Sequence, residues 1–138
     1  MRIFLDANIL VAVLNKEYPL FTYASRIVSL TDNAKYKVYT SPICLAIAFY
    51  FAEKKSGTAL AKQKIEILCN KLLIAEVGKD AVLAALKNKK VNDFEDGMEY
   101  YAAQNYKCTT IITEDTNDFY FAQAEVLKAK DFMEKYLF

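Results

Sequence analysis

Short apolar runs alternate with longer amphipathic segments along the whole chain, and this alternation constrains the fold more than any other feature. The runs at residues 2–5, 36–40, 72–77, 108–113 and 125–127 have the length and composition of strands. The segments between them carry apolar residues at helical spacing. The expected helices span residues 7–14, 19–31, 42–54, 58–71, 79–87, 93–105 and 131–138. Strands that alternate with helices predict an α/β fold, in which helices cover both faces of a mostly parallel sheet.

Polar residues mark the starts of two of these helices. Ser41 followed by Pro42 places a capping side chain before a proline at the first helical position. Asn92, three residues before Glu95, has the form of a capping box and predicts the start of the helix that ends near residue 105.

The chain has 138 residues, of which 54% are hydrophobic, and no repeat or linker divides it. This length is sufficient to bury a core, so we expect one domain over residues 1–138. Its 18 basic and 17 acidic residues give a net charge of +1. Any attraction to the phosphates of a nucleic acid must therefore come from local patches.

The chain contains no histidine, and its three cysteines, Cys44, Cys69 and Cys108, are far apart. This pattern argues against a zinc site and against nucleophilic catalysis by a Ser–His or Cys–His pair. We expect the cysteines to be small apolar residues of a reduced protein. No signal peptide and no apolar run of membrane-spanning length are visible, so the expected location is the cytoplasm.

Acidic residues stand where two predicted strands end. Asp6 follows the first strand, and the acidic loop 113–118 follows the fourth. Asp93 and Asp96 lie at the start of the helix that leads into the fourth strand. Because parallel strands end at the same edge of a sheet, where ligands bind, we expect these acids to meet in one crevice.

Carboxylates that meet in this way must hold protons or bind a cation, since two charges 4 Å apart repel by ~4 kcal/mol near a protein surface. Oxygen ligands without His or Cys select Mg²⁺ or Mn²⁺, which commonly act on phosphates. Each acid also has an ordinary role open to it. Asp6 and Asp93 could be helix caps, Asp96 could complement the helix dipole, and the loop 113–118 could be a turn.

The helix at 93–105 has three distinct flanks. The stripe expected to face the core consists of Phe94, Met98, Tyr101, Ala102 and Asn105. Asp93, Asp96 and Tyr100 share a second flank. Glu95 and Glu99 share the third, which we expect to be solvated.

Three segments together resemble the PIN-domain nucleases, whose small single-domain members are the toxin ribonucleases of bacterial toxin–antitoxin pairs. The segments are IFLDAN at residues 3–8, NDFEDG at 92–97 and IITEDTNDF at 111–119. Their order, their spacing and the total length match, so the resemblance covers essentially the whole chain. It implies a three-layer α/β/α sandwich around a parallel sheet of about five strands, and cleavage of RNA that depends on Mg²⁺ or Mn²⁺.

The resemblance also implies roles for individual residues. By resemblance, Asp6, Asp96 and Asp115 are the metal ligands, and Asp118 precedes the family's usual Phe; Asp93 is an additional candidate ligand beside them. Asn8 and Thr113 match positions that orient these acids or the attacking water. A water activated by the metal would attack the phosphodiester in line.

One position departs from the family pattern. The family usually has a Glu in the helix after the second strand, six residues beyond a Ser, whereas Ser41 has Ile47 at that distance. The first acid in this helix, Glu53, lies about 9 Å further along the axis. A catalytically weak or inactive PIN-like module that binds RNA or a protein partner is therefore the alternative. Retention of the other acids favours the enzyme.

Two other α/β families also place an acid after the first strand. Haloacid-dehalogenase-like phosphatases have a second Asp two residues later, where this chain has Asn8. Receiver domains have an acceptor Asp after the third strand, where only Glu76 and Asp80 occur. Both families are therefore disfavoured.

The resemblance implies RNA, an antitoxin protein and a second copy of the chain as partners, and no membrane. Lysines at 54–55, 62–64 and 87–90 could steer RNA, although lysines at helix ends are commonly just solvated. The run Phe49-Tyr50-Phe51 is either a docking surface for a protein partner or, as we expect, part of the core.

Overall fold

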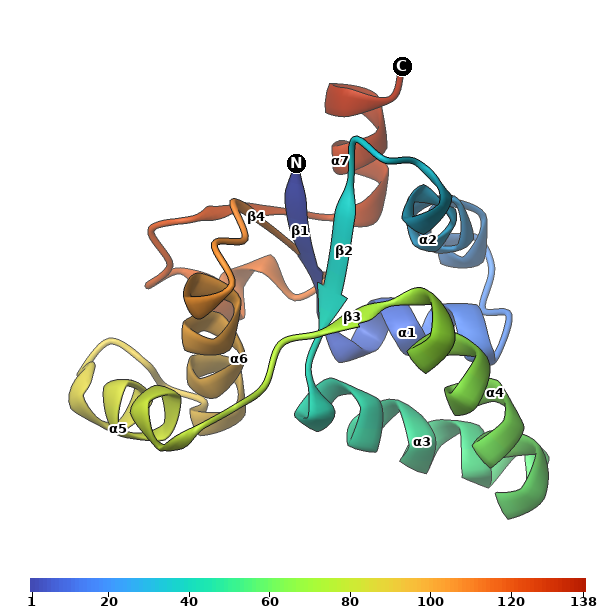
Figure 1. Cartoon of the computed structure of the whole chain (residues 1–138), viewed down its shortest axis with the longest axis horizontal. Helices are drawn as coiled ribbons and strands as arrows, with labels where there is room; N and C mark the ends of the chain where they lie inside the picture. Colours follow the sequence, from blue (N-terminus) through green and yellow to red (C-terminus); the bar gives the residue numbers. More distant parts are fainter.

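Five parallel strands form one sheet in the computed structural model, which describes residues 1–138 (Figure 1). They are β1 Arg2–Leu5, β2 Lys37–Thr40, β3 Leu73–Ile74, β4 Thr110–Ile112 and β5 Glu125–Leu127. Their spatial order is β3-β2-β1-β4-β5, so β1 is the central strand. Phe4 of β1 pairs with Tyr39 on one side and Ile111 on the other. This confirms the predicted α/β fold.

Helices lie on both faces of the sheet. They are α1 Ala7–Leu14, α2 Leu20–Ser29, α3 Pro42–Ser56, α4 Thr58–Lys71, α5 Lys79–Lys87, α6 Phe94–Asn105 and α7 Ala129–Tyr136, with short 3-10 helices η1 Leu30–Asp32 and η2 Thr116–Phe119. In Figure 1, α5 and α6 lie to the left of β1 and β2, and α2 lies to their right. The three-layer α/β/α arrangement is thus the observed one.

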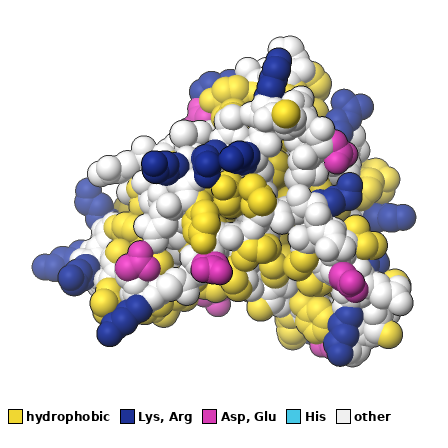
Figure 2. All heavy atoms as spheres, in the orientation of Figure 1, with side chains coloured by type: hydrophobic (Ala, Val, Ile, Leu, Met, Phe, Trp, Pro, Cys, Tyr) yellow, Lys and Arg dark blue, Asp and Glu magenta, His cyan; other side chains and the backbone are white.

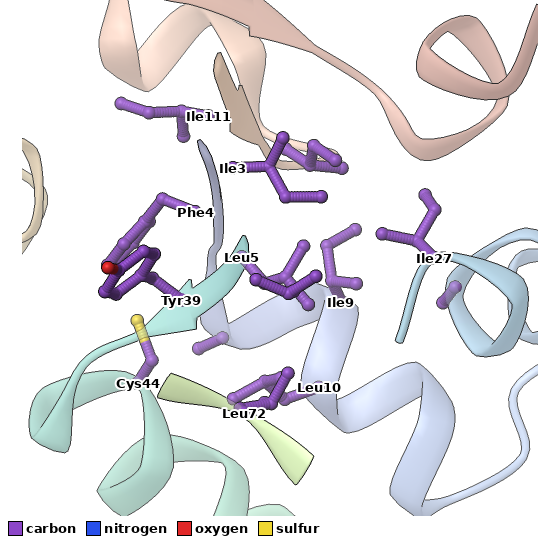
Figure 3. Close-up of a cluster of buried hydrophobic side chains, with 14 of the residues drawn as sticks. Ile3, Phe4, Leu5, Ile9, Leu10, Ile27, Tyr39, Cys44, Leu72 and Ile111 are labelled. Atoms are coloured by element: carbon purple, nitrogen blue, oxygen red, sulfur yellow. The ribbon is translucent and has the colours of Figure 1, made fainter. Parts of the chain in front are cut away.

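The central strand forms because its side chains are apolar without interruption. Ile3, Phe4 and Leu5 are completely buried, as expected of a parallel strand with helices on both faces. Figure 3 shows them among other buried side chains, including Ile9 and Leu10 of α1. The cluster fixes the end of β1, and therefore the position of the residue that follows it.

The predicted helix starts are correct at α3 and shifted at α6. The Ser41 hydroxyl accepts a hydrogen bond from the backbone N–H of Cys44 at 3.2 Å, with Pro42 at the first helical position. Asp93, rather than Asn92, caps α6, because its carboxylate accepts from the backbone N–H groups of the next helical turn. The capping box was therefore assigned one residue too early.

The strand predicted at 72–77 is much shorter in the structure. Only Leu73 and Ile74 pair with β2, and the N–H of Ala75 then donates to Thr40, the last residue of β2. Since β3 is an edge strand, it ends where its only neighbour ends.

Gly97 permits close packing between α6 and the segment before it. A Cβ atom at this position would lie 2.6 Å from Cγ1 of Val91 and 3.0 Å from Cβ of Ala85. The first turn of α6 therefore rests directly on α5 and on the loop that joins the two helices.

The outer side of α3 and α4 exposes large apolar side chains. Tyr50 is 51% exposed and Phe51 is 45% exposed, so the expectation that they belong to the core is wrong. Leu60 and Ile67 of α4 are also exposed. The helices that pack against α3 include α1, α4 and α6, and they leave Tyr50 and Phe51 exposed. Figure 2 likewise shows apolar atoms exposed on one face, with Lys and Arg side chains mostly around its rim.

No helix combines the length and the apolar composition that crossing a membrane requires.

Candidate metal centre

A crevice of about 470 Å³ opens at the carboxyl edge of the sheet, beyond the ends of β1 and β4. The strand order reverses here, because the chain places β2 on one side of β1 and later places β4 on the other. Parallel sheets bind ligands at such switch points. Asp6 directly after β1 and Asp115 in the loop after β4 both line the crevice.

Eight carboxylates and no basic side chain line this crevice. The acids are Asp6, Glu17, Asp93, Glu95, Asp96, Glu114, Asp115 and Asp118. The whole chain has 17 acidic residues and a net charge of +1, so close to half of its negative charge is concentrated at one place. Such a cluster attracts cations and repels free phosphate.

The structure brings together all seven residues predicted from the sequence. Those that line the crevice are Asp6, Asn8, Asp93, Asp96, Asp115 and Asp118. Thr113 is buried beneath them and donates its hydroxyl hydrogen to Oδ2 of Asp6 at 2.8 Å. Three segments that are distant in sequence therefore meet, while the roles of the individual residues remain predictions.

Asp6 is both a helix cap and a crevice residue. Its Oδ1 accepts from the backbone N–H of Ala7 at 2.7 Å, which caps α1. Its Oδ2 accepts from Thr113 and, at 3.4 Å, from Nδ2 of Asn8. The interpretations of Asp6 as a helix cap and as a metal ligand are therefore compatible. Oδ1 makes the capping hydrogen bond, and each carboxylate oxygen has a further lone pair that could bind a cation.

Asn8 connects the two acidic strand ends. Its Nδ2 lies 3.1 Å from Oγ1 of Thr113 and 3.3 Å from Oδ2 of Asp115. Its Oδ1 accepts from the backbone N–H of Glu114 at 3.1 Å. One amide side chain thus holds the loop after β4 against the end of β1.

The crowding of acids changes their protonation. Burial is the main cause that raises the pKa of Asp6, and the charge of Asp115 adds to it, against hydrogen bonds from Thr113, Glu99 and Ala7. The pKa of Asp96 is raised to about 7, first by partial burial and then by the charges of Asp93 and Asp6. A bound cation would reverse these effects, because it favours the charged form of each carboxylate.

Glu99 is the site residue that the sequence-based prediction misplaced. Glu95 is exposed as expected, but Glu99 is only 1% exposed and belongs to the interior. Its Oε1 accepts a hydrogen bond from the Cys44 thiol at 2.6 Å, and a carboxylate oxygen of Asp6 lies within 4.8 Å of its ligand-capable oxygen. Helical spacing gave an ambiguous signal, because Glu99 is four residues from Glu95 and three from Asp96.

The predicted core stripe of α6 is only partly correct, since Ala102 is buried and Tyr101 packs against the core, whereas Phe94 and Asn105 are exposed. The buried residues of this helix are Gly97, Glu99, Tyr100, Ala102 and Ala103. Phe94, which was expected to be buried, is 43% exposed. The helix turns small residues inward because Gly97 packs closely on α5, and this orientation carries Glu99 into the interior.

The α3 side of the crevice has no acid. Ile47 lines it at the position where the family usually has a Glu. Glu53 lies further along α3, outside the crevice, and accepts a hydrogen bond from the Thr58 hydroxyl. The replacement of the family's usual Glu by Ile47 therefore leaves the α3 wall of the crevice without a carboxylate.

The donor set fits a hard divalent cation. The polar groups that line the crevice are carboxylates and the Asn8 amide, with no imidazole among them. All three cysteines are free, as expected, but Cys69 is exposed, and Cys44 is hydrogen-bonded to an acid instead of being only apolar. Carboxylate-rich sites of this kind suit Mg²⁺ and Mn²⁺.

Comparison with known proteins agrees with this geometry. Residues 2–117 match the PIN domain family. A ribonuclease VapC1 from Aquifex aeolicus (strain VF5) is 25% identical over 139 residues, which cover 98% of this chain and 95% of that protein. The structure of VapBC-1 from nontypeable Haemophilus influenzae superposes with a TM-score of 0.72 at 17% identity, covering 94% of this chain and 99% of that one.

A second solved structure shares the fold. Mycobacterium tuberculosis VapC20, described as a Sarcin-Ricin loop cleaving toxin, superposes with a TM-score of 0.62 at 17% identity, covering 79% of this chain and 86% of that one. Since the family match spans most of the sequence and the sheet has the same fold, this chain belongs to the PIN-domain family.

Proposed function

We propose that this protein is an endoribonuclease that depends on Mg²⁺ or Mn²⁺, and that it is the toxin of a toxin–antitoxin pair. The observation that carries the proposal is the crevice with eight carboxylates and no basic side chain at the switch point of a PIN-domain sheet. The name of the Aquifex aeolicus relative, a ribonuclease, supports RNA as the substrate.

In this proposal Asp6, Asp96 and Asp115 hold the cation, and Asp93 and Asp118 are further carboxylates within the same crevice. A bound divalent ion of this type polarises a phosphodiester oxygen and lowers the pKa of a bound water.

Thr113 and Asn8 are positioning residues. The Thr113 hydroxyl holds Oδ2 of Asp6, and the Asn8 amide reaches Asp6, Thr113 and Asp115. These hydrogen bonds restrict the rotamers of two proposed ligands that come from different loops. Ligands that are held in this way lose less conformational entropy when they bind an ion.

The proposed partners are RNA and an antitoxin, together with a second copy of this chain. Structures in which relatives form VapBC complexes support the antitoxin. The exposed apolar residues of α3 and α4, Tyr50, Phe51, Leu60 and Ile67, are suitable for covering by a protein. Gel filtration with light scattering tests the homodimer, and a mass equal to one chain would remove it from the proposal.

A second candidate function follows from Ile47. A PIN-domain module that binds RNA or a protein without cleavage would need no complete set of acids, and the α3 wall of the crevice lacks one. This candidate predicts that RNA is bound but stays intact.

The test is digestion of RNA by the purified protein with Mn²⁺, with Mg²⁺ and with EDTA, alongside Asp6→Asn. We expect cleavage with either ion, none with EDTA and a loss of at least about a hundredfold in Asp6→Asn. Isothermal titration with Mn²⁺ accompanies the digestion. Saturable Mn²⁺ binding without cleavage would favour the non-cleaving module, and absence of Mn²⁺ binding would overturn the proposal.

A further inference from the structure

Glu99 of α6 lies beside Asp6, near the wall of the crevice where α3 contributes Ile47 in place of an acid. We propose that Glu99 is a metal ligand of this centre and supplies from α6 the carboxylate that α3 lacks. This inference rests on the proposed function, because it concerns the same metal ion.

The geometry places Glu99 among the other proposed ligands. The ligand-capable atoms of Asp6, Cys44 and Glu99 lie within 4.8 Å of one another. The charges of Asp6 and Asp96 are also the ones that act on the Glu99 carboxyl group. Oxygens that share one Mg²⁺ at about 2.1 Å each are within about 4.2 Å of one another. A carboxylate that lies this close to Asp6 needs little movement to bind the same ion.

The surroundings of Glu99 give its charge no partner within the protein. The groups around its carboxyl are the Cys44 thiol and the charges of Asp6 and Asp96, and none of them is basic. A buried carboxylate is costly unless it is paired or coordinates a metal. A cation between Asp6 and Asp96 would supply the missing positive charge.

Cys44 fixes the orientation of this carboxylate. Figure 3 shows Cys44 near the start of α3 with its sulfur directed toward the sheet. The thiol donates to Oε1 of Glu99, while the Ser41 hydroxyl donates to the sulfur at 3.3 Å. A thiol sulfur is a soft ligand, whereas a hard ion prefers carboxylate oxygens, which leaves Glu99 as the ligand of this pair.

The alternative is a purely structural role, in which Glu99 is always protonated and serves as a neutral hydrogen-bonding group. Glu99→Gln separates the two roles, because an amide resembles a protonated carboxyl in shape but lacks the negative charge. Mn²⁺ affinity is measured by isothermal titration for the wild type, Glu99→Gln and Ile47→Glu/Glu99→Gln. Glu66→Gln is the control, since it removes an exposed acid of α4 that lies outside the crevice.

If Glu99 is a ligand, Mn²⁺ binding should be at least about tenfold weaker in Glu99→Gln, but should change less than about threefold in Glu66→Gln. Ile47→Glu should restore most of the lost affinity in the Glu99→Gln background, because it returns an acid to the α3 wall. Circular dichroism of each variant without metal verifies folding. We expect no loss of thermal stability in Glu99→Gln, since it removes a buried acid from a group of acids.

Wild-type Mn²⁺ affinity in a folded Glu99→Gln protein would overturn this inference and assign Glu99 a structural role. Asp6→Asn separates that outcome from failure of the proposed function. If Asp6→Asn loses Mn²⁺ and Glu99→Gln retains it, only the inference about Glu99 fails. If the wild type binds no Mn²⁺, both fail.

Discussion

Acidic side chains at the two opposite edges of the sheet have opposite electrostatic surroundings. At the start of β5, Glu125 receives hydrogen bonds from Lys135, from the Tyr136 hydroxyl at 2.6 Å and from Thr110 at 2.9 Å. Burial would raise the pKa of Glu125, but these hydrogen bonds hold it below its usual value. At the carboxyl edge, burial and neighbouring acids raise the pKa values of Asp6 and Asp96 instead.

The difference lies in the supply of positive charge. Lys135 forms an ion pair with Glu125, so this acid has its positive partner within the chain itself. The crevice has eight acids and no Lys or Arg in its lining. One fold thus contains an acid that is paired within the chain and a group of acids without a basic partner in the crevice, and the following predictions compare them.

The largest difference is expected between Asp6→Asn and Glu125→Gln. Asp6→Asn removes the most central ligand and should weaken Mn²⁺ binding and RNA cleavage by at least about a hundredfold. Glu125→Gln also removes one negative charge but should leave both unchanged. Calorimetry and RNA digestion measure the two effects. Equal losses in the two variants would mean that general negative charge, rather than the crevice, attracts the ion.

Saturation with metal should stabilise the folded protein substantially. Binding that is restricted to the native state contributes about 2.7 kcal/mol when Mn²⁺ reaches a hundred times its dissociation constant. We expect a rise of several degrees in the melting temperature of the wild type and of Glu125→Gln, and none in Asp6→Asn. Differential scanning fluorimetry with and without EDTA provides the measurement. A rise that persists in Asp6→Asn would place the ion elsewhere.

The metal-free protein should become less stable as pH rises from about 4 to about 7. The pKa of Asp96 is about 7 in the folded state and near 3.8 when unfolded, so the folded state binds more protons in this interval. Stability therefore falls with rising pH and levels off above the folded pKa. Thermal melts in EDTA should show this decline, and Asp96→Asn should flatten it. A wild-type profile that rises through the interval contradicts the prediction.

The smallest effect is expected from Glu125 and has the opposite pH dependence. Its pKa is lowered on folding, so its contribution is present above the usual pKa of a Glu and disappears as pH falls through the folded value. Lys135 is fully exposed, and ion pairs with exposed partners contribute little. Glu125→Gln should lower the melting temperature slightly at pH 7, less so in high salt. If salt does not change this decrease in melting temperature, the effect of Glu125→Gln comes from altered packing and not from the lost ion pair.

The sheet could be predicted well from the sequence because each strand is recognisable from the pattern of its own residues. The uninterrupted apolar run of Ile3, Phe4 and Leu5 identifies a central strand, and Asp6 must then stand at its carboxyl end. The meeting of Asp6 with Asp115 follows from topology alone, since all parallel strands end at one edge. Such features need no knowledge of side-chain packing.

Glu99, Tyr50 and Phe51 were misplaced because their burial depends on neighbours distant in sequence. Glu99 is buried because Cys44, 55 residues earlier, meets it with a thiol. Tyr50 and Phe51 are exposed because the helices that pack against α3 leave them uncovered. Amphipathic spacing indicates that a helix has an apolar and a polar side, but packing against other elements decides which side is buried.

The proposed metal centre depends on Gly97, a residue that has no functional group of its own. Replacing a helical Gly with Ala commonly stabilises a protein by up to about 1 kcal/mol, and engineers use the exchange for that purpose. Here the added methyl group would overlap Val91 and approach Ala85 too closely, so α6 would have to withdraw from α5. Asp96 and Glu99 would move with it. Selection for heat tolerance at residue 97 would thus act against both the packing of α6 and the arrangement of the crevice acids.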